Sequence, residues 1–96
     1  MKLNKKQIKA LRGWAHHLKP IVMIGKSLMT DTVKKELALC LKAHELIKVK
    51  IQAEDRDDFL GLVEELLVCT KSSLVQIIGR MVIVYSPNPQ KRKYAI

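Results

Sequence analysis

The segment LIKVKIQ at residues 46–52 alternates apolar and polar side chains from Ile47 to Gln52. Successive side chains of a β-strand point to opposite faces of its sheet, so this alternation predicts a strand. One face of the strand is purely aliphatic and requires a core, whereas the other carries Lys48 and Lys50. The segment therefore predicts a sheet with one covered face and one basic face that reaches water.

The segments on either side of this strand have the apolar period of amphipathic helices. The stripe before it is formed by Val33, Leu37, Cys40 and Leu41, and the stripe after it by Phe59, Val63, Leu66 and Leu67. Thr30 and Asp55 are the expected N-caps, because their side-chain oxygens can accept hydrogen bonds from free helix amides. The acidic side chains at 54–58 suit the positive end of a helix dipole, so they need no catalytic explanation.

The N-terminal part of the chain predicts a helix followed by a short strand. Asn4 can cap the helix, with Gln7 in the capping-box position, and Pro20 ends it near Leu18. The strand at 21–24 is apolar at every position, which is typical of a strand that is buried on both faces.

The C-terminal part predicts a β-hairpin. Two apolar runs, at 74–78 and 81–85, are separated by Gly79-Arg80. A two-residue loop with glycine first favours a type II′ turn. The prolines at 87 and 89 then end the sheet, and we expect residues 90–94 to form a flexible basic stretch.

The resulting order is α-β-α-β-α-β-β, a compact α/β module with a four-stranded mixed sheet. The first strand–helix–strand unit should be right-handed and parallel, and the last two strands antiparallel. We expect the two later helices to cover one face and the N-terminal helix to cover part of the other. A single domain over residues 1–87 and a basic C-terminal tail over 88–96 follow from this interpretation.

Charge is distributed unevenly along the chain. Residues 1–30 hold seven lysines and arginines and no acid, whereas all nine acids lie between Asp31 and Glu65. Residues 66–96 hold five more basic residues and again no acid, within a formal net charge of +9. If both ends fold onto one side, that side carries a strong positive field, and nucleic acid is the leading partner.

Several other classes of protein are disfavoured. The uninterrupted apolar runs are far shorter than the about 20 residues of a membrane helix, and the N-terminus lacks a secretory pattern. Gly25-Lys26-Ser27 resembles a phosphate-binding loop, but Pro20 stands where that loop needs a glycine. Cys40 and Cys69 fit buried cytosolic thiols, and the three histidines lack metal-ligand spacing. We expect a cytoplasmic protein that is not an enzyme and uses no cofactor and no metal.

Aromatic side chains are scarce, at 4% of the residues. RNA-binding sheets that stack bases need aromatics on adjacent central strands, and the first three predicted strands have none. Base stacking is therefore not expected to be the main mode of recognition. We expect Trp14 to be a core or helix-packing residue.

The chain also resembles a known family. The resemblance lies in Leu11-Arg12, Ala15-His16, Leu18-Lys19-Pro20, Ile24-Gly25-Lys26, Thr30, the run at 44–50 and the block from 75 to 87. These segments resemble the CRM (chloroplast RNA splicing and ribosome maturation) domain family, whose bacterial stand-alone members are YhbY-like proteins.

The resemblance implies an RNA-binding fold similar to the C-terminal domain of translation initiation factor three. It also implies association with precursors of the large (50S) ribosomal subunit. A family hallmark is a Gly-x-x-Gly loop after the first strand; here Leu28 replaces its second glycine. We expect the loop to bind phosphate through Lys26 and the amides around Ser27.

We therefore predict an RNA-binding protein that docks on structured ribosomal RNA and acts in large-subunit assembly. A DNA-binding, nucleoid-type protein and a module for an acidic protein partner are the alternatives. We expect a monomer with no small-molecule substrate and no membrane partner. The predicted RNA contacts are Lys5, Lys9, Arg12, His16, Lys19, Gly25, Lys26, Ser27, Lys48, Lys50 and Arg80.

Overall fold

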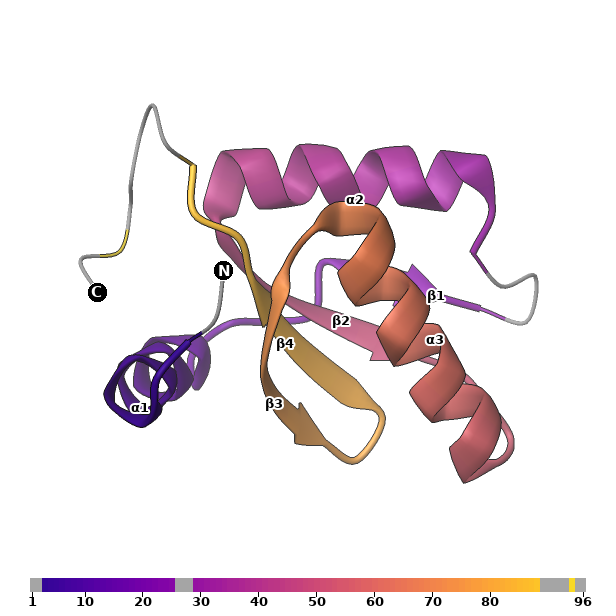
Figure 1. Cartoon of the computed structure of the whole chain (residues 1–96). Helices are drawn as coiled ribbons and strands as arrows, with labels where there is room; N and C mark the ends of the chain where they lie inside the picture. Colours follow the sequence, from indigo (N-terminus) through magenta and orange to yellow (C-terminus); the bar gives the residue numbers. More distant parts are fainter. Residues whose placement is uncertain (1–2, 26–28, 89–93, 95–96) are drawn as a thin grey trace.

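The computed structural model describes residues 3–25, 29–88 and 94. Within them the predicted element order is confirmed (Figure 1). The elements are α1 (Lys5–Ala15), β1 (Val22–Ile24), α2 (Asp31–His44), β2 (Leu46–Ile51), α3 (Arg56–Thr70), β3 (Ser73–Ile78) and β4 (Met81–Tyr85).

The four strands form one mixed sheet in the order β1-β2-β4-β3. β1 runs parallel to β2, and β4 is antiparallel to both of its neighbours, as expected for the first pair and the hairpin. The sequence did not predict that β4 inserts between β2 and β3. This insertion places the closing strand next to the alternating strand at the centre of the sheet.

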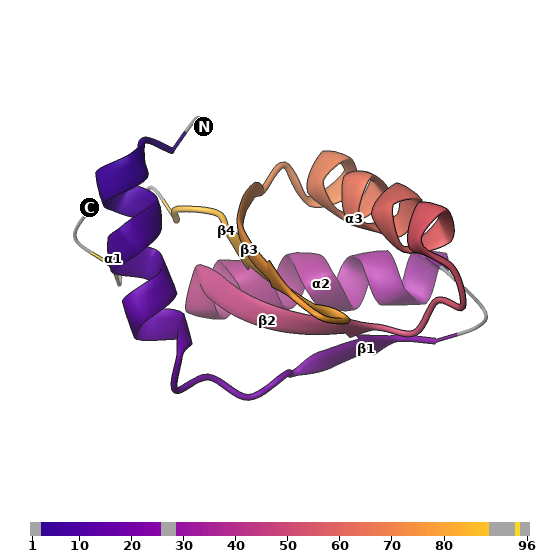
Figure 2. The ribbon, with the colours of Figure 1, turned by 90° about the horizontal axis from the view of Figure 1, so that it is seen from below.

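Helices cover the two faces of the sheet unequally (Figures 1 and 2). α2 and α3 pack on one face over a core that includes Ile47, Val49 and Ile51. α1 packs on the opposite face, where Leu11 and Ala15 belong to a second, smaller buried cluster. Because α1 lies across only one end of that face, the rest of the face is left open.

The predicted N-caps are confirmed for all three helices. Asn4, Thr30 and Asp55 each accept a hydrogen bond from the backbone amide three residues on, at 2.8, 3.2 and 2.8 Å. Each such cap stabilises its helix by about 1 kcal/mol. The first helix ends at Ala15, three residues earlier than predicted, because the Leu18 amide bonds to the Ala15 carbonyl in a tighter turn.

The hairpin turn has the predicted form. Ile78 pairs with Met81, so the loop contains only two residues, and Gly79 has a φ of +59°. Arg80 is absent from the described non-glycine residues with positive φ, which fits type II′ and excludes type I′.

Burial differs from the sequence predictions at three places. β1 is buried on one face only: Met23 is 56% exposed, because β1 is an edge strand that α1 does not cover. Cys69 is exposed on α3, and Cys40 is only partly buried, so the expectation of two buried thiols was wrong. Trp14 is 41% exposed and packs on Tyr94 with ring centroids 5.2 Å apart.

A buried carboxylate at the end of α2 was not predicted. Glu45 is almost fully buried at a φ of +63°, and its backbone carbonyl accepts a bond from the Ser86 amide. The Tyr85 hydroxyl donates to Glu45 Oε2 at 3.3 Å. These bonds join the start of β2 to the end of β4 beneath α1.

Candidate nucleic-acid interface

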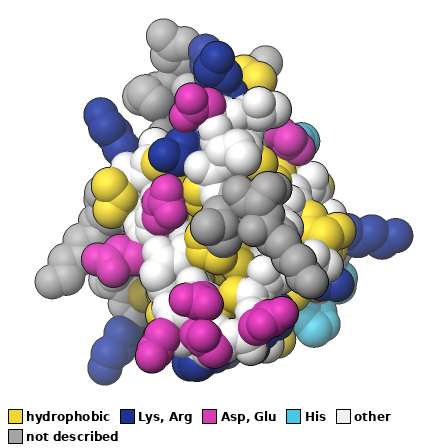
Figure 3. Space-filling view, turned by 90° about the vertical axis from the view of Figure 1, so that its right-hand side faces the viewer, with side chains coloured by type: hydrophobic (Ala, Val, Ile, Leu, Met, Phe, Trp, Pro, Cys, Tyr) yellow, Lys and Arg dark blue, Asp and Glu magenta, His cyan; other side chains and the backbone are white. Residues whose placement is uncertain are grey.

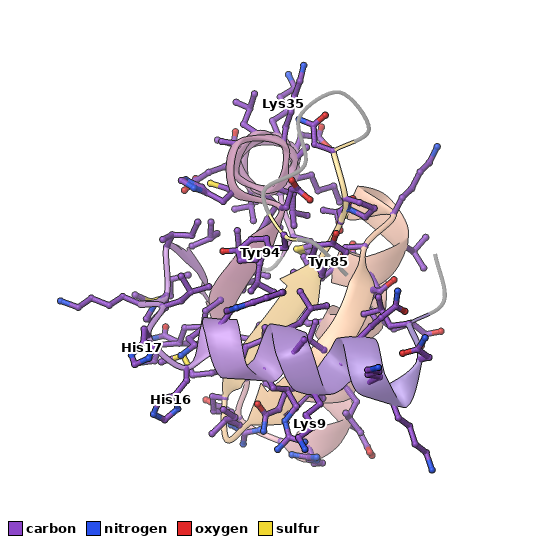
Figure 4. The ribbon with its side chains drawn as sticks, turned by 90° about the vertical axis from the view of Figure 1, so that its left-hand side faces the viewer. Lys9, His16, His17, Lys35, Tyr85 and Tyr94 are labelled. Atoms are coloured by element: carbon purple, nitrogen blue, oxygen red, sulfur yellow. The ribbon has the colours of Figure 1, made fainter. Side chains whose placement is uncertain are left out.

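One flank of α1 carries four of the predicted contacts. Lys5, Lys9, Arg12 and His16 recur at three- and four-residue spacing, which places them on one side of a helix. They line an open groove of about 750 Å³ whose remaining walls include Gln76 and Ile78 of β3. Figure 4 shows Lys9 and His16 on this side of α1, and Tyr85 and Tyr94 on the other.

The helix holds this flank outward because its apolar stripe is fixed to the sheet. Leu11 and Ala15 are fully buried with Leu46, Ile83 and Tyr85. The four basic side chains are exposed, and the groove lining contains no acidic residue among those described. A polyanion in the groove would therefore meet cations without a competing carboxylate.

The predicted second patch lies on the same face of the sheet. Lys48 pairs with Ile83, and Lys50 pairs with Met81, so both lysines share the α1 side of the sheet. Both lysines are partly buried. They project from the face of the sheet next to α1 and do not form a separate surface. The structure thus brings the helical stripe and the strand lysines into one basic face.

The predicted loop begins next to the C-terminal end of β2. Gly25 directly follows β1, where the Gln52 amide bonds to the Ile24 carbonyl and the Ile51 amide bonds to the Arg80 carbonyl. The strand β2, from Leu46 to Ile51, is about 17 Å long. Lys26 and Ser27 lie outside the described residues, so their roles stay predictions.

Besides Gly25, Lys48 and Lys50, two further predicted contacts do not line the groove. Lys19 is exposed in the connection between α1 and β1, and it does not line the groove. The Arg80 guanidinium lies 5.1 Å from the Phe59 ring centre and donates to the Glu54 carbonyl at 3.5 Å. Phe59 belongs to the core under α3, so Arg80 points to the helix-covered side of the sheet.

The family profile described as the CRS1 / YhbY (CRM) domain matches residues 3–86. The chain belongs to the CRM domain family. The sequence resemblance is therefore confirmed over nearly the whole chain.

Similar proteins come from distant bacteria. A Pseudomonas aeruginosa protein named a probable RNA-binding protein is 42% identical over 93 residues, covering 97% of this chain and 89% of the relative. A Bacillus subtilis protein with the same description is 36% identical and covers 95% of each chain. The solution structure of a Staphylococcus aureus protein aligns with a TM-score of 0.76, at 39% identity and 88% coverage of both chains.

A cluster of acidic residues in this CRM domain lies on the far side of the sheet from the groove. Figure 3 shows acidic side chains clustered at the N-terminal end of α3, which packs on the opposite face of the sheet. Repulsion from the Asp55 carboxylate raises the pKa of Asp58, which lies exposed beside it. The acidic side chains that cap α3 are therefore separated from the basic face by the sheet.

Three further observations concern possible metal ligands, the cysteine thiols and membrane-spanning helices. Among the described residues, histidines, cysteines and carboxylates do not gather in threes as metal ligands would. Partial burial raises the pKa of both cysteine thiols, which disfavours their reactive thiolate form. In the same part of the chain, no helix combines the length and apolar character needed to cross a bilayer.

The sequence analysis did not identify the residues that line the groove beside the predicted cations. Ile8, Gln76 and Ile78 line the groove together with those cations. Gln76 and Ile78 lie in the predicted hairpin, whose two-residue loop implies that Ile78 pairs with Met81. What was missing was the strand order, which brings this hairpin beside Lys48 and Lys50.

Proposed function

We propose that this CRM domain is a cytoplasmic RNA-binding protein that docks, as a monomer, on structured ribosomal RNA during assembly of the large ribosomal subunit. The observation that carries the proposal is the groove between α1 and β3, lined by Lys5, Lys9, Arg12 and His16. RNA as the partner is supported further by the relatives, which are named probable RNA-binding proteins. The ribosomal target rests on the family resemblance.

The mechanism is electrostatic docking with a defined orientation. Each lysine or arginine that neutralises a phosphate releases condensed counterions, and this release drives binding. Lysines 5, 9, 48 and 50 and Arg12 lie on one face, whereas the acidic cluster lies beyond the sheet. The domain therefore approaches RNA with α1 and the open sheet first.

Crosslinking in cells, followed by sequencing of the attached RNA, tests the proposal. We expect reads concentrated at a few sites of large-subunit ribosomal RNA, from particles that sediment as its precursors. The matched control is the variant in which Lys9 and Arg12 are both changed to Gln, which should lose those sites while remaining folded. Reads spread over messenger RNA, or association that survives ribonuclease, would contradict the proposal.

Duplex DNA is the sharpest competitor for the same cations. A competition experiment between folded ribosomal RNA and DNA of equal phosphate number separates the two partners. We expect RNA to displace DNA from the groove. Preferential binding of duplex DNA would favour the nucleoid-type alternative instead.

A further inference from the structure

The open part of the sheet carries an apolar row next to the basic groove. Met23, Lys50, Met81 and Ile78 pair in register and form one row across all four strands. Met23 is 56% exposed and Ile78 is 50% exposed. Three of the four side chains in this row are therefore apolar, and the outer two reach well into solvent.

This row lies beyond the part of the sheet that α1 covers. α1 rests on Leu46, Ile83 and Tyr85, at the other end of the same face. Ile21, the residue directly before β1, donates its amide hydrogen to the Lys48 carbonyl and is 46% exposed. The apolar surface thus extends along the edge strand β1.

Positive charge lies within this apolar row and along one side of it. Lys50 stands within it, and the cationic flank of α1 forms a wall on one side. Ile78 itself lines the groove together with Lys9 and Arg12, so the apolar and cationic surfaces are continuous. The fitting ligand offers both an apolar surface and regularly spaced negative charge.

An unpaired stretch of RNA has this combination of properties. Its bases are free to leave the stack and lay their faces on side chains, while its phosphates stay available to cations. A continuous duplex turns its bases inward and presents phosphates and riboses, so it would leave the apolar row facing water. Charge complementarity together with exposed apolar area therefore favours the unpaired form.

We propose that the groove selects an unpaired RNA segment, such as an internal loop or bulge, whose bases pack on Met23, Met81 and Ile78. The phosphates of the same segment contact Lys9 and Arg12. This inference rests on the proposed function and specifies which RNA structure the same site takes. Aliphatic packing replaces the aromatic stacking that the sequence lacks.

A pair of RNA duplexes, each made from two annealed strands and with equal numbers of phosphates, tests the inference. One duplex is fully paired and the other contains a short internal loop. We expect the wild-type protein to bind the looped RNA at least about fivefold more tightly. Equal affinities would overturn this inference and leave the proposed function standing, whereas binding to neither RNA would overturn the proposed function itself.

Variants of the apolar row test whether these side chains cause the preference for the RNA with an internal loop. Met23→Ser combined with Met81→Ser, at two residues of the row that do not line the groove, should abolish this preference while keeping duplex affinity within about twofold. The matched control replaces Leu39 and Val68 by Ser, which are also exposed apolar residues but lie on α2 and α3. A double variant of the row that keeps the wild-type preference, or a control that loses it, would overturn the inference.

Photocrosslinking of the protein without these substitutions tests the same contacts even if the variant misfolds. Photoreactive methionine can replace the natural side chain throughout the chain. Crosslinks from Met23 or Met81 to the unpaired nucleotides are expected. Crosslinks confined to Met29, which packs against the core under α2 and α3, would overturn the proposal.

Discussion

Removing charge from the exposed flank of α1 should change the salt dependence of RNA binding in a predictable way. The perturbation is Lys5→Gln, Lys9→Gln and Arg12→Gln in one variant. All three side chains are exposed and line the groove, while Leu11 and Ala15 keep α1 on the sheet. The variant should therefore fold normally, as circular dichroism can check.

The magnitude follows from the number of phosphate contacts. Five or six cations on the basic face give a slope of log affinity against log salt of about −4. The wild-type protein should then lose about 250-fold in affinity between about 50 and 200 mM salt. Each lost contact removes about 0.7 to 0.9 from the slope, so the triple variant should lose only about 10-fold over the same range.

The assay is fluorescence anisotropy of a labelled ribosomal RNA fragment at several salt concentrations. The control removes three lysines from α2 (Lys34→Gln, Lys35→Gln and Lys42→Gln), which packs on the other face of the sheet. In Figure 4, Lys35 lies across the molecule from Lys9. The control should shift the slope by less than about one unit. Equal shifts from the two variants would mean that only net charge matters, and recognition by a defined surface would be refuted.

Three further predictions concern stability and the packing around α1. Tyr85→Phe removes the donor to the buried Glu45 carboxylate and should lower the free energy of unfolding by about 1–3 kcal/mol in urea titrations; an unchanged midpoint would contradict this. Tyr94→Ala should shift the emission of Trp14, the single tryptophan, to longer wavelength, because the ring that packs on it is lost; unchanged emission would argue against the contact. Gly79→Ala places a side chain at a φ of +59° where space is open, so backbone strain alone should cost about 1–2 kcal/mol, read from the thermal midpoint.

Local sequence patterns predicted most of the fold because local physics decides it. Helix starts depend on a few neighbouring groups, and Asn4, Thr30 and Asp55 bond as their sequence positions indicated. The hairpin turn likewise depends on two residues, of which Gly79 supplies the positive φ. These features needed no knowledge of distant parts of the chain.

Features that depend on which elements become neighbours could not be predicted. An all-apolar segment such as 21–24 indicates burial on both faces, yet its exposure is decided by its place at the sheet edge and by how far α1 reaches. The same holds for Tyr94, which lies in the segment predicted to be flexible but packs on Trp14. The basic stripe of α1 was predicted because helical spacing is local, whereas the groove residues Gln76 and Ile78 on β3 required the strand order.

A titration of the isotope-labelled protein with a ribosomal RNA fragment, followed by amide chemical shifts, tests directly whether RNA binds the α1 face of the sheet. The largest shifts should fall on the exposed flank of α1, on β2 around Lys48 and Lys50, and on Gln76 to Ile78 of β3. The amides of α3, beyond the sheet, should change little. Shifts concentrated on α2 and α3, with α1 unaffected, would contradict the account.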